Sequence, residues 1–252
     1  MRRKTSFTCG GIYHIYTRGI DGKVIFPDWS CYEYFTSLME HCLNYDYPYS
    51  SLKQRLKKAQ TDMERQLILS QLEEKGISSP VDIFCFSIMP THPHLIVQQK
   101  EVNGVTNFFH RVFTSYSRYF NLRQERKGSL YESAFEAVCV ESDQQLIHLS
   151  RYQHINQKAL GLNTVEELSD YPWSSLSTYL GEREISFVDP DPILSFFSGP
   201  EEYADFVSAE IDEYEPLRIA GVAIDDDFGW FARFRALEEA RKKELREEFK
   251  LL

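Results

Sequence analysis

The sequence predicts an α+β sandwich, with helices packed on the faces of a sheet, followed by an acidic and mostly helical C-terminal extension. Strand-like and helix-like segments alternate over the first 180 residues, and a hydrophobic content of 42% is ample for a packed core. The net charge of −10 arises at the end of the chain, because residues 1–180 hold 19 basic and 19 acidic residues whereas residues 181–252 hold 9 and 19. We therefore divide the chain into a domain at 1–181 and an extension at 182–252.

Four segments are expected to contribute strands, because they alternate in polarity or are rich in β-branched and aromatic residues. They are residues 9–20, 81–88 and 92–99, with one or two further short strands within 130–140. Pro93 is tolerable only at a strand start or an edge, since it has no amide hydrogen to donate.

Apolar residues at three- and four-residue steps predict amphipathic helices. One helix begins at Asp28 or Ser30, either of which is a good N-cap, and runs to about residue 44. Ser142 or Asp143 opens another helix, and Gly161 ends it. Further helices are expected over 104–121, in a short segment that ends at 181, over 200–213 and over 229–250.

Residues 51–76 form a charged insertion with only a thin apolar stripe. We expect one or two helices that project from the domain. A solvated face is favoured over a DNA-contacting arm, because charge runs on helices usually face water.

The cysteine and hydropathy patterns argue against a disulfide-rich secreted protein and against a membrane protein. The five cysteines, at 9, 31, 42, 85 and 139, form no C-x-x-C pair, which predicts free thiols in a reducing compartment. No apolar h-region follows the basic N-terminus, and no apolar run approaches 18 residues. We expect a cytoplasmic protein with no membrane partner.

His92 and His94 are the candidate metal ligands. Residues at i and i+2 of a strand point to the same face, so both imidazoles can converge on one divalent cation. The motif alone is weak, because such pairs are often incidental. Asp82 and Glu136 are alternative carboxylate ligands. His14 could lie near this site or in the core, and the core is favoured.

Tyr152 and Asn156 are the candidate nucleophile and a further ligand. They are four residues apart in a predicted helix, hence on one face. A phenol can attack phosphorus and leave a covalent intermediate, while a metal stabilises charge on the phosphate oxygens. The competing interpretation is a core aromatic residue and an amide that binds the helix end.

These residues lie in segments that resemble the single-tyrosine HUH transposases, of the kind associated with repetitive extragenic palindromes. The resemblance covers about residues 9–181, and its motifs occur in the same order and at plausible spacing. The segments are 13–19 (Tyr-His-Ile-Tyr-Thr-Arg-Gly), 25–28, 89–97 (Met-Pro-Thr-His-Pro-His-Leu-Ile-Val), 128–135, 151–156 (Arg-Tyr-Gln-His-Ile-Asn) and 170–175.

The resemblance implies a ferredoxin-like core whose antiparallel sheet carries the histidine pair. It implies Tyr152 as the nucleophile, with His92, His94 and Asn156 as ligands of Mg²⁺ or Mn²⁺. The implied partner is single-stranded DNA beside short hairpins, cut and rejoined through a 5′-phosphotyrosine link in the nucleoid of a prokaryotic cell. Monomers and homodimers with shared active sites both occur in the family, so the oligomeric state stays open.

Three positions depart from the family pattern. Thr91 stands where Asn is usual, Pro93 lies between the histidines, and Gln157 replaces the Pro that usually follows Asn156. The last change lets the helix run on and alters the angle at which Asn156 is presented. None of the three removes a proposed ligand or the nucleophile.

The remaining candidates are DNA contacts and rival functions. A balanced charge in the first 180 residues allows phosphate binding, with tyrosines as stacking surfaces for unpaired bases. The first rival is a hairpin-binding protein that is derived from such a transposase, does not turn over and is shielded by its acidic extension. The second is a metal-dependent hydrolase of another phosphodiester. Candidate phosphate contacts are Arg18, Arg111, Arg118, Arg151 and Lys158, and candidate stacking residues are Tyr116 and Tyr119.

Overall fold

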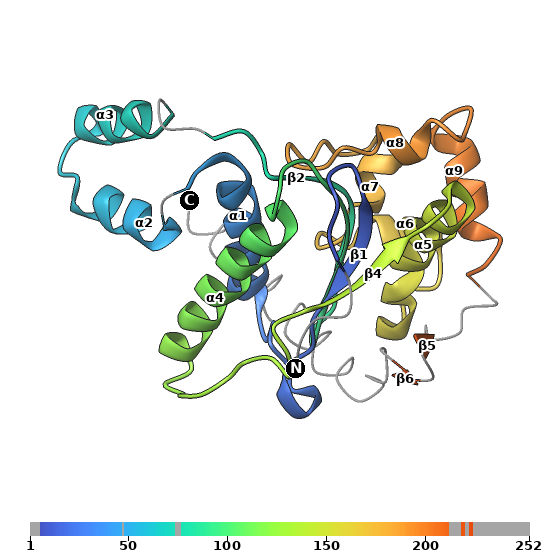
Figure 1. Ribbon diagram of the computed structural model, residues 1–252, viewed down its shortest axis with the longest axis horizontal. Coiled ribbons are helices and arrows are strands. Elements are labelled where there is room, and N and C mark those ends of the chain that lie inside the picture. Colours follow the sequence, from blue (N-terminus) through green and yellow to red (C-terminus); the bar gives the residue numbers. More distant parts are fainter. Residues whose placement is uncertain (1–5, 47, 74–76, 212–217, 220–221, 224–252) are drawn as a thin grey trace, which may run out of the picture.

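A four-stranded antiparallel sheet lies at the centre of the computed structural model, which describes residues 6–46, 48–73, 77–211, 218–219 and 222–223 (Figure 1). The strand order is β2-β3-β1-β4. With α1 after β1 and α4 after β3, this is the βαββαβ ferredoxin-like arrangement, as predicted. The strands are β1 (Ile12–Tyr16), β2 (Val81–Ile88), β3 (Pro93–Gln99) and β4 (Glu136–Val140).

Helices α1 (Trp29–Asn44) and α4 (Gly104–Arg123) cover one face of the sheet. Alternate residues of the strands, among them Tyr13, Ile15, Leu95 and Val97, pack with these helices in the larger hydrophobic core. The two helices form because their apolar residues recur every three or four positions and so line one side.

The opposite face of the sheet is covered by the helices that follow β4 (Figure 1). Their apolar residues form a second core with Phe84, Cys85 and Ile96 of the sheet. Phe84 and Cys85 both reach it because a β-bulge shifts the register of β2 between Ile83 and Cys85. The elements are α5 (Asp143–Ile155), the 3₁₀ turn η2 (Asn156–Leu160), α6 (Val165–Ser169), α7 (Leu176–Tyr179), α8 (Asp191–Leu194) and α9 (Pro200–Ser208).

The part of the chain between residues 182 and 211 packs on this second core. Ile193, Tyr203 and Val207 are fully buried in it, and Asp189 donates its backbone N–H to Ile83 O at the edge of the sheet (2.8 Å). The division at residue 181 stays a prediction. The expected helices over 229–250 and the acidic run at 225–227 lie outside the described residues, which end with the short strands β5 (Arg218–Ile219) and β6 (Val222–Ala223).

Helices α2 (Tyr49–Lys58) and α3 (Asp62–Glu73) project from the domain beside α1, as expected for the charged insertion (Figure 1). Met63 and Leu67 are 81% and 56% exposed. The two ends of this insertion meet at a hydrogen bond in which the backbone N–H of Ile77 donates to Asn44 O at 2.8 Å. Across the described ranges, no helix has both the length and the apolar character needed to cross a bilayer.

Two predicted elements are shorter than expected. The first strand begins at Ile12 instead of residue 9, because Gly10 adopts a left-handed φ of 77° that interrupts extended backbone. Of the one or two short strands expected within 130–140, β4 forms. The earlier part contributes only an isolated bridge between Tyr131 and Gly19, and Gly19 directly precedes the 3₁₀ turn η1 (Ile20–Gly22).

Helix α5 is tied to its surroundings by a fully buried histidine. His154 Nδ1 lies 2.7 Å from the Tyr203 hydroxyl of α9, and Nε2 lies 2.8 Å from Ser175 Oγ. Ser175 Oγ also accepts from the backbone N–H of Phe86 in β2 at 3.0 Å. Burial lowers the pKa of His154 to about 3, so the neutral ring holds α5 against β2 and α9.

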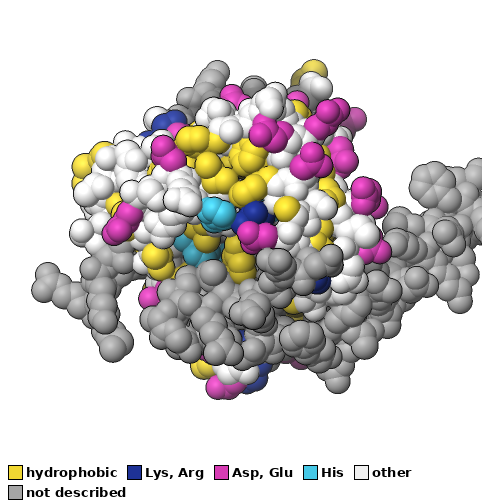
Figure 2. Space-filling view, turned by 90° about the vertical axis from the view of Figure 1, so that its right-hand side faces the viewer, with side chains coloured by type: hydrophobic (Ala, Val, Ile, Leu, Met, Phe, Trp, Pro, Cys, Tyr) yellow, Lys and Arg dark blue, Asp and Glu magenta, His cyan; other side chains and the backbone are white. Residues whose placement is uncertain are grey.

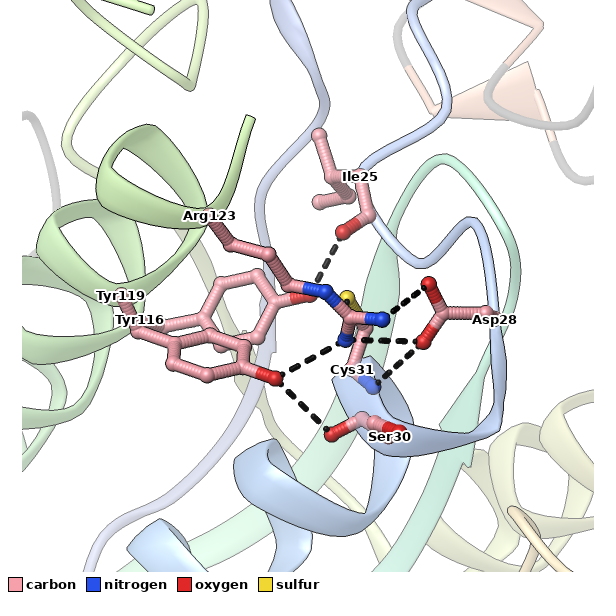
Figure 3. A network of polar contacts seen from close by, with 7 residues as sticks. All are labelled: Ile25, Asp28, Ser30, Cys31, Tyr116, Tyr119 and Arg123. Carbon is pink, nitrogen blue, oxygen red and sulfur yellow. Dashed lines mark hydrogen bonds and ion pairs between the residues drawn. The ribbon is translucent and has the colours of Figure 1, made fainter. Parts of the chain in front are cut away.

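Asp28 joins the start of α1 to the end of α4 (Figure 3). Its Oδ1 accepts from the backbone N–H of Cys31 at 3.2 Å, so Asp28 is the N-cap and not Ser30, the other candidate from the sequence. Its two oxygens also face Arg123, with Nη1–Oδ1 at 3.0 Å and Nη2–Oδ2 at 2.9 Å. Arg123 Nη1 further donates to the Tyr119 hydroxyl at 3.0 Å. The cap and the ion pair therefore share one carboxylate.

Replacing Asp28 separates these two contributions. Asp28→Ala removes both the cap and the half-exposed ion pair, and we expect the free energy of unfolding to fall by about 1–2 kcal/mol in urea titrations. Asp28→Asn keeps a cap acceptor and loses only the charge, so it should cost less than about 1 kcal/mol. Equal losses in the two variants would assign the effect to the charge and contradict the capping role.

Stability should fall in acid because of His154. Its pKa is about 3 in the folded protein and about 6.5 in an unfolded chain, so below pH 6.5 the unfolded state alone takes up a proton. The contribution is complete above about pH 6.5 and is lost toward pH 3, at about 1.4 kcal/mol per pH unit. Urea titrations at pH 7, 6 and 5 should show a flatter pH dependence for His154→Gln than for wild type. Parallel curves would refute the assignment.

Candidate active site

Three imidazoles lie together on the sheet face that α5 covers. His94 of β3 stands opposite Tyr16 of β1 and Ser87 of β2. His14 is two residues before Tyr16, so it occupies the same face, diagonal to His94. His14 Nε2 and His94 Nδ1 are 2.9 Å apart, and the rings are stacked with centroids at 5.1 Å.

His92 joins this group from the turn that precedes β3. Met89 and His92 exchange two backbone hydrogen bonds, and the strand itself starts only at Pro93. The His92 ring still packs edge-on against the His94 ring, with centroids 4.7 Å apart. Thr91 Oγ1 lies 2.7 Å from His92 Nδ1, so the Thr91 hydroxyl braces the imidazole.

Tyr152 shares a pocket with His14. The pocket has a volume of about 360 Å³ and lies between α5 and the strands β1 and β4. Tyr152 is half-buried at its wall. Because His14 is hydrogen-bonded to His94, the phenol and the histidine group lie on the same side of the sheet. The pocket is lined by His14, Val138, Val140, Gln145, His148, Leu149 and Tyr152.

The end of α5 lies over the histidine end of β2 and β3. The carboxamide of Gln157 donates through Nε2 to Ser87 Oγ, and Ser87 is the cross-strand neighbour of His94. Asn156, next to Gln157, is fully buried as the first residue of η2. The α-helix stops at Ile155 and tightens into the 3₁₀ turn, so the expected continuation past Asn156 is not α-helical.

Gln153 is a polar residue that the sequence analysis missed. Its side chain is fully buried in α5, and within the described ranges neither its carboxamide oxygen nor its nitrogen has a hydrogen-bond partner. Such burial costs about 1–3 kcal/mol. A glutamine inside an amphipathic helix has no sequence signal that separates this position from a solvated one.

Tyr16 is a second tyrosine beside the histidines. Its ring centroid is 5.3 Å from that of His14 and 6.0 Å from that of His94. Burial, and then the negative charge of Glu136, raise its pKa. The phenolate of Tyr16 is therefore harder to form than that of an ordinary tyrosine, and Tyr16 does not line the pocket that contains Tyr152.

The alternative carboxylate ligands lie apart from the histidines. Asp82 is at the other end of β2, where it forms an ion pair with Lys100 at 3.0 Å. Glu136 is exposed. It pairs with Tyr16 from β4, whereas His94 pairs with Tyr16 from β3, so Glu136 and His94 are two strands apart. Two strand spacings amount to roughly 10 Å. In the portion of the chain that is described, no group of three or more His, Cys, Asp or Glu residues is placed to hold a metal ion.

Two of the candidate phosphate contacts are tied to the end of α9. Arg151 is 6% exposed; it forms an ion pair with Glu210 and stacks on Phe206 with 4.0 Å between its guanidinium carbon and the ring centroid. Lys158 donates to the backbone carbonyl of Ile211. On this face of the molecule, histidine, basic and acidic side chains adjoin one another among hydrophobic ones (Figure 2). Arg151 and Lys158 therefore both interact with groups of the protein itself.

The other three cations have different surroundings. Arg111 donates to the backbone carbonyls of Cys42 and Tyr45 and so satisfies the C-terminal end of α1. Arg118 is exposed on α4, and the half-buried Arg18 has its guanidinium beside Gly22. These contacts leave Arg118 as the most accessible of the five cations.

The two candidate stacking tyrosines lie on α4, on the opposite side of the sheet from the histidines. Tyr116 is fully buried and donates to Ile25 O at 2.5 Å, so the expectation of a stacking surface is wrong for this residue (Figure 3). Tyr119 is half-buried and stacks on Tyr34 at 3.8 Å. Tyr116 cannot stack on a base because aromatic residues on the apolar side of a helix are buried in the core.

His14 is both a buried residue and a neighbour of the site, two positions that the sequence treated as alternatives. It is buried, as expected for the core, but it connects His94 to the pocket of Tyr152. The strand period indicated only that His14 and Tyr16 share a face. The neighbour of His14 on that face is decided by the pairing of β1 with β3, which brings His14 to His94, 80 residues away in the sequence.

Comparisons with known proteins identify one distant structural similarity. No family model matches the chain, and no curated protein matches it. Among solved structures, the chain is similar to a REP-associated tyrosine transposase bound to a REP hairpin, with 12% sequence identity and a TM-score of 0.44. The match covers 75% of this chain and 97% of that chain. This is a similarity in fold alone.

Proposed function

We propose that this protein is a metal-dependent enzyme that cuts and rejoins single-stranded DNA next to hairpins, with Tyr152 as the nucleophile. One observation carries the proposal: His14 is bonded to His94 and lines the same pocket as Tyr152. The phenol thus lines a pocket with a histidine that is bonded to one candidate metal ligand, although the residues are distant along the chain. A phenol near a metal ion supports covalent catalysis at a phosphodiester, because the phenol supplies the nucleophile and the metal would stabilise the charge on the phosphate.

The chemistry follows from the position of the phenol. Tyr152 loses its proton, and its oxygen attacks the phosphorus of a phosphodiester that lies in the pocket. The bond from phosphorus to the 3′ oxygen breaks, and that oxygen gains a proton. The downstream strand is left on the enzyme as a 5′-phosphotyrosine ester. Attack by a 3′-hydroxyl on this ester reverses the step and rejoins the strand, so the energy of the phosphodiester bond is conserved.

The residues present fit a divalent cation. His92 and His94 are fully buried, and the Nδ1 of each is held by a neighbouring group, Thr91 Oγ1 or His14 Nε2. Nε2 of each ring would be the ligand atom, with the amide oxygen of Asn156 as a third donor. A bound Mg²⁺ or Mn²⁺ would stabilise the charge that develops on the phosphate oxygens.

A second candidate function is hairpin binding without cleavage. It is favoured by the complete burial of His92, His94 and Asn156, since a phosphate must reach groups that have no exposed surface. The internal contacts of Arg151 and Lys158 do not separate the two candidates, because they withdraw two cations from the DNA that either function has to bind. The two candidates differ in one product, the covalent adduct.

The nucleophile is tested by exchange of single tyrosines. We expect wild type with Mn²⁺ and a 3′-labelled hairpin oligonucleotide to yield a labelled protein that survives denaturation. Tyr152→Phe should abolish this adduct, at least about a thousandfold, because a phenyl ring offers no oxygen to phosphorus. Tyr16→Phe is the matched control, since it removes the other phenol beside His94, and it should keep the adduct.

Each other outcome has a definite meaning. An adduct that Tyr16→Phe abolishes and Tyr152→Phe retains would move the nucleophile to β1. Hairpin binding with no adduct under either metal would establish the second candidate. Metal-dependent cleavage without an adduct would identify a hydrolase.

The amide ligand is tested by two leucine substitutions in the same helical segment. Asn156→Leu should weaken Mn²⁺ binding tenfold or more, which corresponds to about 1.4 kcal/mol of binding free energy. Gln153→Leu removes the other buried carboxamide and should leave the affinity within about twofold, a difference of about 0.4 kcal/mol. Calorimetric titration of the full chain measures both. The reverse pattern would make Gln153 the ligand.

A further inference from the structure

A neutral imidazole is the form that binds a metal ion, and a hydrogen bond between two such rings restricts where their protons lie. His14 Nε2 and His94 Nδ1 are 2.9 Å apart and both rings are buried, so one nitrogen carries the hydrogen and the other accepts it. A neutral imidazole has a single N–H. The proton position in His94 therefore decides the proton position in His14.

Only one of the two arrangements is compatible with a cation at His94. If Nε2 of His94 offers its lone pair to a metal ion, its hydrogen must be on Nδ1, which then donates to His14 Nε2. The reverse arrangement puts the hydrogen of His94 on Nε2 and blocks that atom. His92 has a parallel arrangement, because its Nδ1 faces the Thr91 hydroxyl at 2.7 Å, and a hydroxyl oxygen can accept.

We propose that His14 is a positioning residue: it accepts a hydrogen bond from Nδ1–H of His94 and so holds His94 in the tautomer that can bind the metal ion. The inference rests on the proposed function, because it assumes a cation at His94. It assigns to His14 on β1 the role that Thr91 has for His92. The stacking of the two rings at 18° keeps the acceptor in place.

The assignment also excludes a tempting alternative. His14 lines the pocket of Tyr152 and could be taken for the base that removes the phenol proton. A ring that accepts through Nε2 carries its hydrogen on Nδ1, so it has no second lone pair for that proton. The geometry thus separates the positioning of His94 from the activation of Tyr152.

Metal affinity in three variants of the full chain tests the role. Phe at position 14 keeps the ring and removes the acceptor, and His14→Phe should weaken Mn²⁺ binding 10- to 100-fold. In His14→Gln the Oε1 atom can take the place of Nε2, so the affinity should return to within about threefold of wild type, or about 0.7 kcal/mol. His148→Phe, another histidine of the same pocket, is the matched control and should bind Mn²⁺ as wild type does. Free Mn²⁺ is measured by electron paramagnetic resonance.

Equal affinity of His14→Phe and wild type would overturn the inference, and so would a loss in His14→Gln as large as that in His14→Phe. The first result would show that the acceptor is unnecessary. The second would show that the ring, and not the acceptor, is required.

The tautomer can be observed without metal. Nitrogen-15 NMR of the imidazoles in wild type should show the hydrogen of His94 on Nδ1, and a hydrogen on Nε2 would refute the inference directly. This result also separates the two proposals. If wild type binds no Mn²⁺ but His94 carries its hydrogen on Nδ1, the proposed function fails and the tautomer assignment stands.

Discussion

The antiparallel pairing of β1 with β3 is the constraint on which the rest of the molecule depends. These are the two central strands, and each sends alternate side chains to opposite faces. Tyr13 and Ile15 enter the core under α1 and α4, while His14 faces α5. A shift of one residue in this register would turn the imidazoles into the larger core, where they would lose their partners. The contact between His14 and His94 therefore depends on the register in which β1 pairs with β3.

The helix that carries Tyr152 is held by polar contacts as much as by apolar ones. His154 of α5 binds Tyr203 and Ser175, and Gln157 of the adjoining turn η2 binds Ser87, so this helical segment is joined to α9 and β2 at buried positions. Buried hydrogen bonds are directional, and an unpaired group there is costly. They restrict rotation of α5 about its axis, which apolar contacts alone would resist less. The phenol is thus fixed relative to the sheet.

Local patterns predicted most elements because their causes are local. The N-cap at Asp28, the strand over 81–88 and the end of the 3₁₀ turn η2 at Gly161 each follow from residues within a few positions. The surroundings of the cations were not predictable in this way. In the sequence, Arg111 and Arg151 cannot be told apart from arginines that bind phosphate. In the structure, Arg111 donates to the end of α1 and Arg151 to the carboxylate of Glu210, each of which is 50 or more residues away.

The sequence by itself placed His92 and His94 two residues apart where a strand begins, and Tyr152 and Asn156 four residues apart in one helical segment, because these spacings are local. Only the tertiary structure decided that His14 is bonded to His94 and lines the same pocket as Tyr152. It did so through strand pairing and helix packing, which depend on the shape of the whole core. No local pattern encodes contacts of that range, because their geometry exists only once both faces of the sheet are covered.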